Sequence, residues 1–97
     1  LHLAVDRLVR AGAIAPTIVV GVWNRPGHRH AEFYPRKMLE RVPEPLRGEY
    51  LARGMGGQSE SDAYLRFLVE ELKPAIDRRY ATLPGPEHTA VMGSSMG

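Results

Sequence analysis

Residues Thr17-Ile18-Val19-Val20-Gly21-Val22-Trp23 contain the longest apolar run of the chain and decide the fold that the sequence predicts. The apolar side chains occupy consecutive positions and do not alternate with polar ones, as they would in a strand with one face in water. A β-branched run of this kind is typical of a strand that is buried on both faces of a parallel sheet. We therefore predict a central strand over residues 17–23.

A helix is predicted on the N-terminal side of this strand. Within residues 1–11, apolar side chains recur at helical spacing on one face, and Gly12 follows where a helix end favours a residue that tolerates positive φ. These apolar positions are Leu1, Ala4, Val5, Leu8 and Ala11.

The clearest helical pattern spans residues 59–79. Ser59 and Asp62 have the spacing of a capping box, and arginines 78 and 79 suit the last turn. Pro74 falls inside the pattern, so we expect it to kink the helix or to restart it. The apolar stripe comprises Tyr64, Leu65, Leu68, Leu72 and Ile76.

Residues 24–60 form a long excursion that prolines and glycines interrupt repeatedly. Short helices are predicted within residues 36–41 and around residues 46–53. Loops of this length are uncommon in compact domains and are often functional.

A second short strand is predicted at residues 89–92, directly before Gly93-Ser94-Ser95-Met96-Gly97. Strands that alternate with helices indicate an α/β fold with a parallel sheet. Two strands cannot stabilise such a sheet alone, so we expect further strands from elsewhere and an incomplete fold within this chain.

The five residues 93–97 match G-x-S-x-G, the nucleophile elbow. A nucleophilic serine at the end of a strand must project its Oγ from a sharp, strained turn, and small residues on either side let strand and helix pass closely. The next backbone N–H can stabilise a developing oxyanion. Ser95 and Met96 are therefore the candidate catalytic residues, as the nucleophile and an oxyanion donor. The competing interpretation is a glycine-rich turn without catalytic function.

Other motifs occur in a fixed order before the elbow. Residues 29–35 read R-x-x-E-F-x-P, and residues 67–80 read F-L-x-x-E-L-x-P-x-I-D-x-x-Y. Together with G-x-S-M-G, this order resembles the α/β-hydrolase esterase family that contains enterochelin esterase and esterase D. The resemblance extends from about Leu8 to Gly97.

This resemblance implies hydrolysis of carboxylic or thiol esters through an acyl-enzyme on Ser95, with a small-molecule ester as substrate. In the family the catalytic acid and histidine follow the serine in the chain. Residues 1–97 are therefore expected to be part of a single α/β-hydrolase domain, without its N-terminal strands and its Asp- and His-bearing C-terminal part. The alternatives are an acyltransferase of the same fold and a non-catalytic fragment or subunit. We also expect pairing with the remaining part of the hydrolase or with a second copy.

Composition sets further limits. The chain has 97 residues, 43% hydrophobic and 25% charged, and its net charge of +2 comes from interleaved charges of both signs, which gives no support to a nucleic-acid partner. It contains no cysteine, so it has neither a disulfide nor a thiolate nucleophile. No apolar run approaches the length of a membrane span, and no targeting segment is visible, which leaves the localisation open.

No cofactor or metal is predicted, although two motifs contain ligand-binding residue types. His28-x-His30-x-Glu32 could present three metal ligands, but it lies in a Pro-Gly loop beside Arg29, which favours a solvated polar loop. The family resemblance implies instead that Arg29 and Glu32 form a buried ion pair or a loop clamp near the active-site rim. The glycines at 54–57 lack the spacing and the lysine of a phosphate loop. Trp23, Phe33 and Tyr34 are candidates either for an acyl pocket or for core packing.

Overall fold

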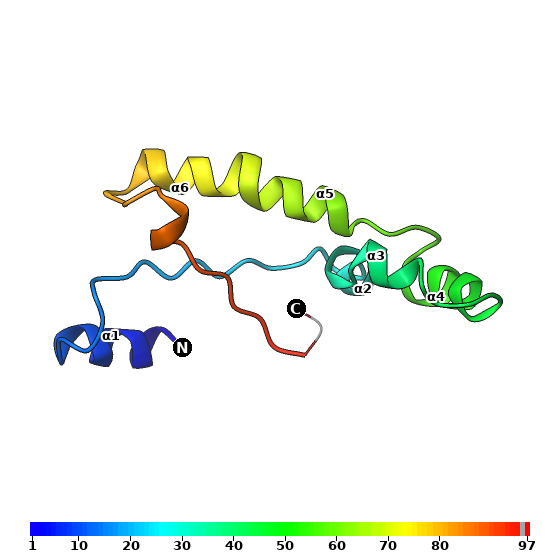
Figure 1. The fold of residues 1–97 in the computed structure, drawn as a ribbon, viewed down its shortest axis with the longest axis horizontal. Coiled ribbons are helices and arrows are strands. Elements are labelled where there is room, and N and C mark those ends of the chain that lie inside the picture. Colours follow the sequence, from blue (N-terminus) through cyan, green and yellow to red (C-terminus); the bar gives the residue numbers. More distant parts are fainter. Residues whose placement is uncertain (96) are drawn as a thin grey trace.

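The computed structural model of the chain describes residues 1–95 and residue 97. Within this part the chain is built from helical segments joined by turns and irregular stretches (Figure 1). The segments are α1 (His2–Arg10), α2 (Arg29–Phe33), α3 (Arg36–Leu39), α4 (Leu46–Gly54), α5 (Ser61–Arg66), the π-helix η1 (Phe67–Leu72), α6 (Lys73–Arg79) and the 3₁₀ helix η2 (Pro86–His88).

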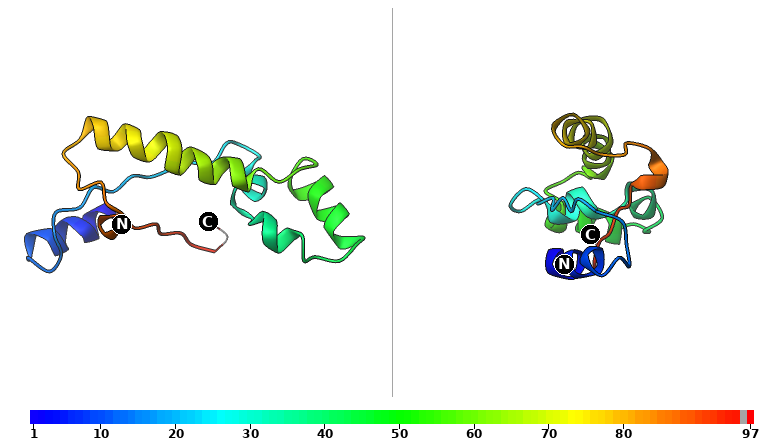
Figure 2. Two further views of the ribbon diagram at one scale, coloured as in Figure 1. Left: turned by 45° about the horizontal axis from the view of Figure 1, so that its top comes forward. Right: turned by 90° about the vertical axis from the view of Figure 1, so that its left-hand side faces the viewer.

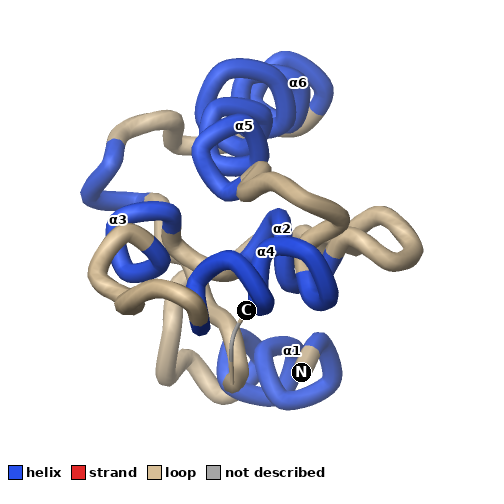
Figure 3. The backbone as a smooth tube through the Cα atoms, turned by 90° about the vertical axis from the view of Figure 1, so that its right-hand side faces the viewer, coloured by secondary structure: helices blue, strands red, loops and turns tan. Residues whose placement is uncertain are grey.

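The predicted α/β fold with a parallel sheet is wrong, because the described residues contain helices and loops but no β-strand (Figure 3). Residues 17–23 and 89–92 are both irregular, and Ile18, Val19 and Val20 are exposed. A strand requires its backbone N–H and C=O groups to bond to a neighbouring strand. Apolar β-branched composition favours that conformation, but it cannot supply the partner.

Helix α1 ends as its sequence predicts. Gly12 has a φ of 70°, and its N–H donates to the carbonyl of Val9 at 3.0 Å. The N–H of Ala13 donates to the carbonyl of Leu8 at 2.9 Å, which completes a Schellman motif. A glycine adopts this left-handed conformation without a steric penalty, so the helix stops at this point.

The long helix comprises α5, η1 and α6 and confirms the helix predicted over residues 59–79, with its start at Ser61. Pro74 lies in the first turn of α6, directly after the π-helix. Proline has no N–H to donate and its ring clashes with the preceding turn of an α-helix. The structure shows no restart at Pro74: Leu72 and Lys73 keep right-handed helical angles, and the wider π turn runs directly into α6.

The predicted capping box at Ser59 and Asp62 is wrong. The N-cap residue of α5 is Glu60, and it makes no side-chain cap hydrogen bond. Asp62 instead pairs with the Nε of Arg36 at 2.7 Å, and the Oγ of Ser61 accepts a hydrogen bond from the Arg36 N–H at 3.1 Å. These polar side chains therefore join α5 to α3.

A small apolar core lies where the short helices meet. Ala31 of α2, Leu39 of α3 and Met55 after α4 are buried, and partly buried Tyr34, Tyr50 and Leu51 pack against them. The predicted helices within residues 36–41 and around 46–53 are confirmed as α3 and α4. This core fixes α2 on the side of the molecule where the C-terminal residues also end.

The molecule is elongated, with principal extents of 52 × 25 × 24 Å. The long helix runs along one side and α1 lies on the opposite side, with irregular segments between them (Figure 2). Among the described residues, no helix is long and apolar enough to cross a membrane.

Candidate functional site

Ser95 occupies a strained turn near the end of the chain. Its φ is 58°, a left-handed value that residues with a Cβ rarely adopt. The Gly97 N–H donates to the carbonyl of Ser94 at 3.1 Å and closes the turn around Ser95. The side chain of Ser95 is exposed. Ser95 therefore lies on a sharp turn with an accessible side chain, but the described residues before it form no strand, which a nucleophile elbow would have.

The two glycines that flank Ser95 leave no room for side chains. A Cβ at Gly93 would overlap the backbone carbonyl of Gly97. A Cβ at Gly97 would lie 2.6 Å from Cδ2 and 2.7 Å from Cε2 of the Phe33 ring. The turn is therefore tight enough that its first and fifth residues meet, and both positions require glycine because of close approach.

Phe33 connects this turn to the helical part of the molecule. It is the last residue of α2, and its ring packs on Tyr64 of α5 with centroids 5.1 Å apart and an interplanar angle of 59°. Burial raises the pKa of the Tyr64 hydroxyl above its ordinary value, and the negative charge of Glu32 raises it further. The Tyr64 hydroxyl is therefore neutral at neutral pH.

A charged network anchors α2. Glu32 is only 6% exposed, and its carboxylate accepts hydrogen bonds from the Arg25 Nε at 2.6 Å and the Arg25 backbone N–H at 3.1 Å. Arg25 Nη2 and His28 Nδ1 both lie within hydrogen-bond distance of Glu60 Oε2, at 2.6 and 2.8 Å. These bonds lower the pKa of Glu60 below its ordinary value, with the hydrogen bond from His28 first and that from Arg25 next.

This network corrects the predicted Arg29–Glu32 pair, because the partner of Glu32 is Arg25. Arg25 and Glu60 were missed in the sequence. A signal for Arg25 existed in the following Pro26-Gly27, which predicts a turn. The His28 N–H donates to the Arg25 carbonyl at 2.9 Å and Gly27 has a φ of 77°, so the turn brings Arg25 back over α2.

The three side chains of the His28-x-His30-x-Glu32 motif, for which no metal is predicted, have separate partners. His28 faces Glu60, His30 Nδ1 lies 2.9 Å from the Tyr50 hydroxyl, and Glu32 binds Arg25. Within the described residues, no group of three or more His, Cys, Asp or Glu side chains could hold a metal ion.

Comparison with known proteins identifies the family. A family model described as "Putative esterase" matches residues 2–97. The chain belongs to this esterase family. No curated protein and no solved structure matches the chain.

Met96, the predicted oxyanion donor, lies outside the described residues. Among the described residues, no hydrogen bond joins the Oγ of Ser95 to a histidine; His28 and His30 are engaged as above, and His88 of η2 lies 3.6 Å from Glu87.

The three predicted pocket aromatics, Trp23, Phe33 and Tyr34, lie in different surroundings. Trp23 is 93% exposed in the irregular segment before α2, so neither of its predicted roles is seen. Phe33 lies against Gly97, and Tyr34 borders an open groove of about 500 Å³ on α4. The other residues of that groove are Val42, Leu46, Glu49, Tyr50 and Arg53.

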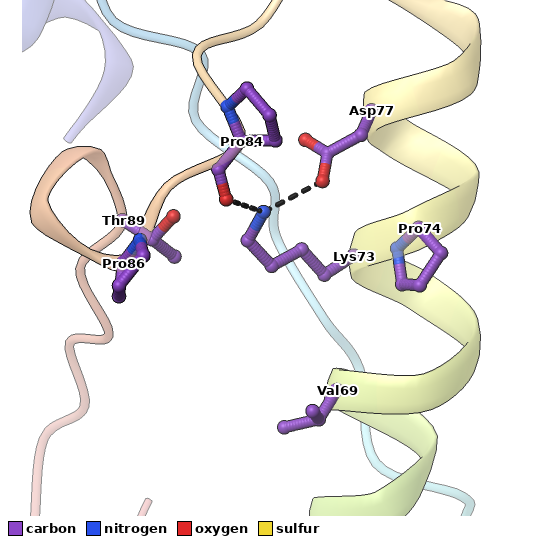
Figure 4. Close-up of a pocket in the computed structure, with 7 residues that line it drawn as sticks. All are labelled: Val69, Lys73, Pro74, Asp77, Pro84, Pro86 and Thr89. Carbon is purple, nitrogen blue, oxygen red and sulfur yellow. Dashed lines mark hydrogen bonds and ion pairs between the residues drawn. The ribbon is translucent and has the colours of Figure 1, made fainter.

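A second open groove of about 460 Å³ lies between the long helix and η2 (Figure 4). Lys73 Nζ bridges it, with 2.6 Å to Asp77 Oδ2 and 2.9 Å to the Pro84 carbonyl. Asp77 also accepts a hydrogen bond from the Thr82 hydroxyl at 2.8 Å. The bond from Lys73, and then that from Thr82, lowers the pKa of Asp77. We name Lys73, Asp77 and Thr82 the lysine clamp, which fastens residues 80–89 to α6.

Proposed function

We propose that this esterase hydrolyses carboxylic or thiol esters through an acyl-enzyme on Ser95, and that it is of the enterochelin esterase and esterase D type. One observation carries the proposal: Ser95 is held at a φ of 58° between two glycines that cannot accept a Cβ. A relaxed glycine-rich turn does not need this combination of strain and close approach. The order of motifs along residues 29–97 supports the assignment to the type.

The proposed chemistry uses the exposed hydroxyl of Ser95. Its oxygen attacks the ester carbonyl, the hydroxyl proton passes to a base, and the alcohol or thiol departs after protonation. Water then attacks the acyl-enzyme and releases the acid. The N–H of Met96 is the proposed donor to the oxyanion in both steps.

The base and the acid are proposed to come from outside residues 1–97, in a longer polypeptide of which this chain is a piece. A serine hydroxyl is a poor nucleophile at neutral pH until an imidazole accepts its proton. The histidines that precede Ser95 do not bond to it in the described residues, and family order places the acid and the histidine after the serine.

The test is labelling of the complete encoded protein with a fluorophosphonate probe, followed by an intact-mass measurement. We expect one adduct, at Ser95, and we expect Ser95→Ala to abolish both labelling and ester hydrolysis. Ser94→Ala is the matched control, because it removes the neighbouring hydroxyl of the same turn, and it should keep most of the labelling rate.

Two results would remove the proposal. One is a folded Ser95→Ala protein that hydrolyses esters at the original rate, and the other is an adduct on Ser94 in place of Ser95. Adding an alcohol acceptor and measuring the ester formed distinguishes hydrolysis from acyl transfer. Products containing the acceptor in preference to free acid would replace the esterase by the acyltransferase alternative.

A further inference from the structure

The turn that carries Ser95 receives little support from the chain that leads into it. Val91 is 88% exposed and Met92 is 74% exposed, and residues 89–93 form neither a helix nor a strand. A turn with left-handed strain persists only where its surroundings hold it in place. The residues that supply this support must therefore come from another part of the molecule.

The ring of Phe33 is in position to provide it. The Cβ built at Gly97 lies 2.6 and 2.7 Å from two ring carbons, so the backbone of Gly97 rests directly on the aromatic ring. Gly97 in turn contacts Gly93 and donates its N–H to Ser94. A shift of Gly97 would therefore also move Gly93 and Ser94, the two residues that precede Ser95.

Phe33 is itself held from two directions. Its ring packs on Tyr64 of the long helix, 5.1 Å away between centroids. Its helix is fixed by buried Glu32, which binds Arg25, and by the Glu60 N–H, which donates to the Ala31 carbonyl at 2.8 Å. A flat ring held in this way offers a firm surface, unlike the end of a flexible side chain.

We propose that Phe33 is a positioning residue for the nucleophile: its ring supports Gly97 and sets where the Ser95 hydroxyl lies. The inference rests on the proposed function of Ser95. A reacting group displaced by about 1 Å can lose on the order of 10²-fold in rate, so loss of the ring should reduce turnover without removing any reacting atom.

The first experiment compares two phenylalanine variants of the complete encoded protein. Phe33→Ala should lower kcat by about 10- to 100-fold and leave KM within about twofold, because the reacting geometry changes while substrate contacts remain. Phe67→Ala is the matched control: its ring also lies beside Tyr64, 6.5 Å between centroids, but it belongs to η1. Phe33→Leu, which keeps apolar bulk, should recover most of kcat.

The second experiment tests the contact with Gly97 directly. Gly97→Ala should inactivate the enzyme in the presence of Phe33 because the new methyl group meets the ring. In a Phe33→Ala background the space is open, so the same substitution should cause little further loss. Strong coupling between the two changes is the expected result.

Several outcomes would overturn the inference while the proposed function stands. Ser95→Ala could abolish activity while Phe33→Ala reduces kcat no more than Phe67→Ala. The second outcome is that the rate losses from Phe33→Ala and Gly97→Ala multiply in the double variant, which would mean that the two residues act independently. If Ser95→Ala leaves hydrolysis intact, the proposed function itself fails, and that result is distinct from the other two.

Discussion

Glycine performs two different tasks in this chain. At Gly12 it supplies a left-handed conformation that ends α1, whereas at Gly93 and Gly97 it supplies space for close approach. Ser95 carries left-handed strain although it has a Cβ, and such a conformation is unfavourable by roughly 1–2 kcal/mol. The residues around Ser95 thus maintain a turn that the serine alone would not choose.

A substitution at Gly93 tests whether the turn needs glycine for its small size or for its backbone flexibility. We expect Gly93→Ala to prevent fluorophosphonate labelling of the complete protein, because its methyl group would displace the Gly97 carbonyl and open the turn. Gly21→Ala is the control, since a Cβ there meets no atom within 4 Å and Gly21 has no positive φ. Equal labelling of the two variants would show that close approach at Gly93 is not needed.

The residue types at the site were predictable, but their contacts were not. The spacing of residues 93–97 predicted a strained turn, and the φ of Ser95 agrees with it. The contact between Phe33 and Gly97 joins residues far apart in the sequence, and the Arg25–Glu32 pair depends on the chain reversal at Pro26-Gly27. No local pattern specifies which distant residue meets a turn.

At the level of elements, helices were predicted well and strands were not. A helix forms its backbone hydrogen bonds within one segment. The apolar spacing of that segment, with the glycine at the end of α1, was therefore enough to predict α1 and the long helix. The run at residues 17–23 has the composition of a strand, yet strand formation depends on a second segment that no part of this chain provides among its described residues.

The lysine clamp should respond to acid. The pKa of Asp77 is lower in the folded chain than its ordinary value of 3.8, so its ionised form favours the clamped state. This stabilisation is present above pH 3.8 and is lost as the pH falls through the lower folded value. At neutral pH, Asp77→Asn should therefore speed hydrogen exchange of the amides in residues 80–89, measured by mass spectrometry, relative to the unsubstituted chain.

The difference between Asp77→Asn and the unsubstituted chain should shrink as the pH is lowered below that range. Asp6→Asn serves as the control, because its exposed pair with Arg10 lies on α1, away from the clamp. The exchange rates of residues 80–89 could instead differ between the two chains by the same factor at every pH. That result would mean that the carboxylate charge of Asp77 does not hold this segment.

As a whole, the molecule buries little apolar surface for its length. The buried apolar side chains among the described residues are Ala31, Leu39 and Met55, and the radius of gyration is 16.9 Å. A compact domain of about 100 residues has a radius near 13 Å. Hydrophobic burial is the main force that opposes chain entropy, so a chain this open has a small margin of stability.

We therefore expect the isolated 97-residue chain to unfold gradually on heating, without a sharp transition, when followed by circular dichroism at 222 nm. Its long helix should still contribute helical signal at low temperature. The comparison is the complete encoded protein, which should unfold cooperatively if the segments proposed to lie outside residues 1–97 cover exposed Ile18 and Val91. A sharp transition for the monomeric 97-residue chain would contradict this expectation.

The π-helix η1 also sets the direction in which the two ends of the long helix face. An α-helix advances about 100° per residue, so a turn that holds one extra residue rotates everything after it by about that angle. Upstream of η1, the Tyr64 ring packs on Phe33; downstream, Lys73 donates a hydrogen bond to the Pro84 carbonyl. If the same residues Phe67–Leu72 were wound as an ordinary α-helix, Lys73 would point about a quarter of a revolution away from the Pro84 carbonyl, so the width of this turn matters independently of its composition.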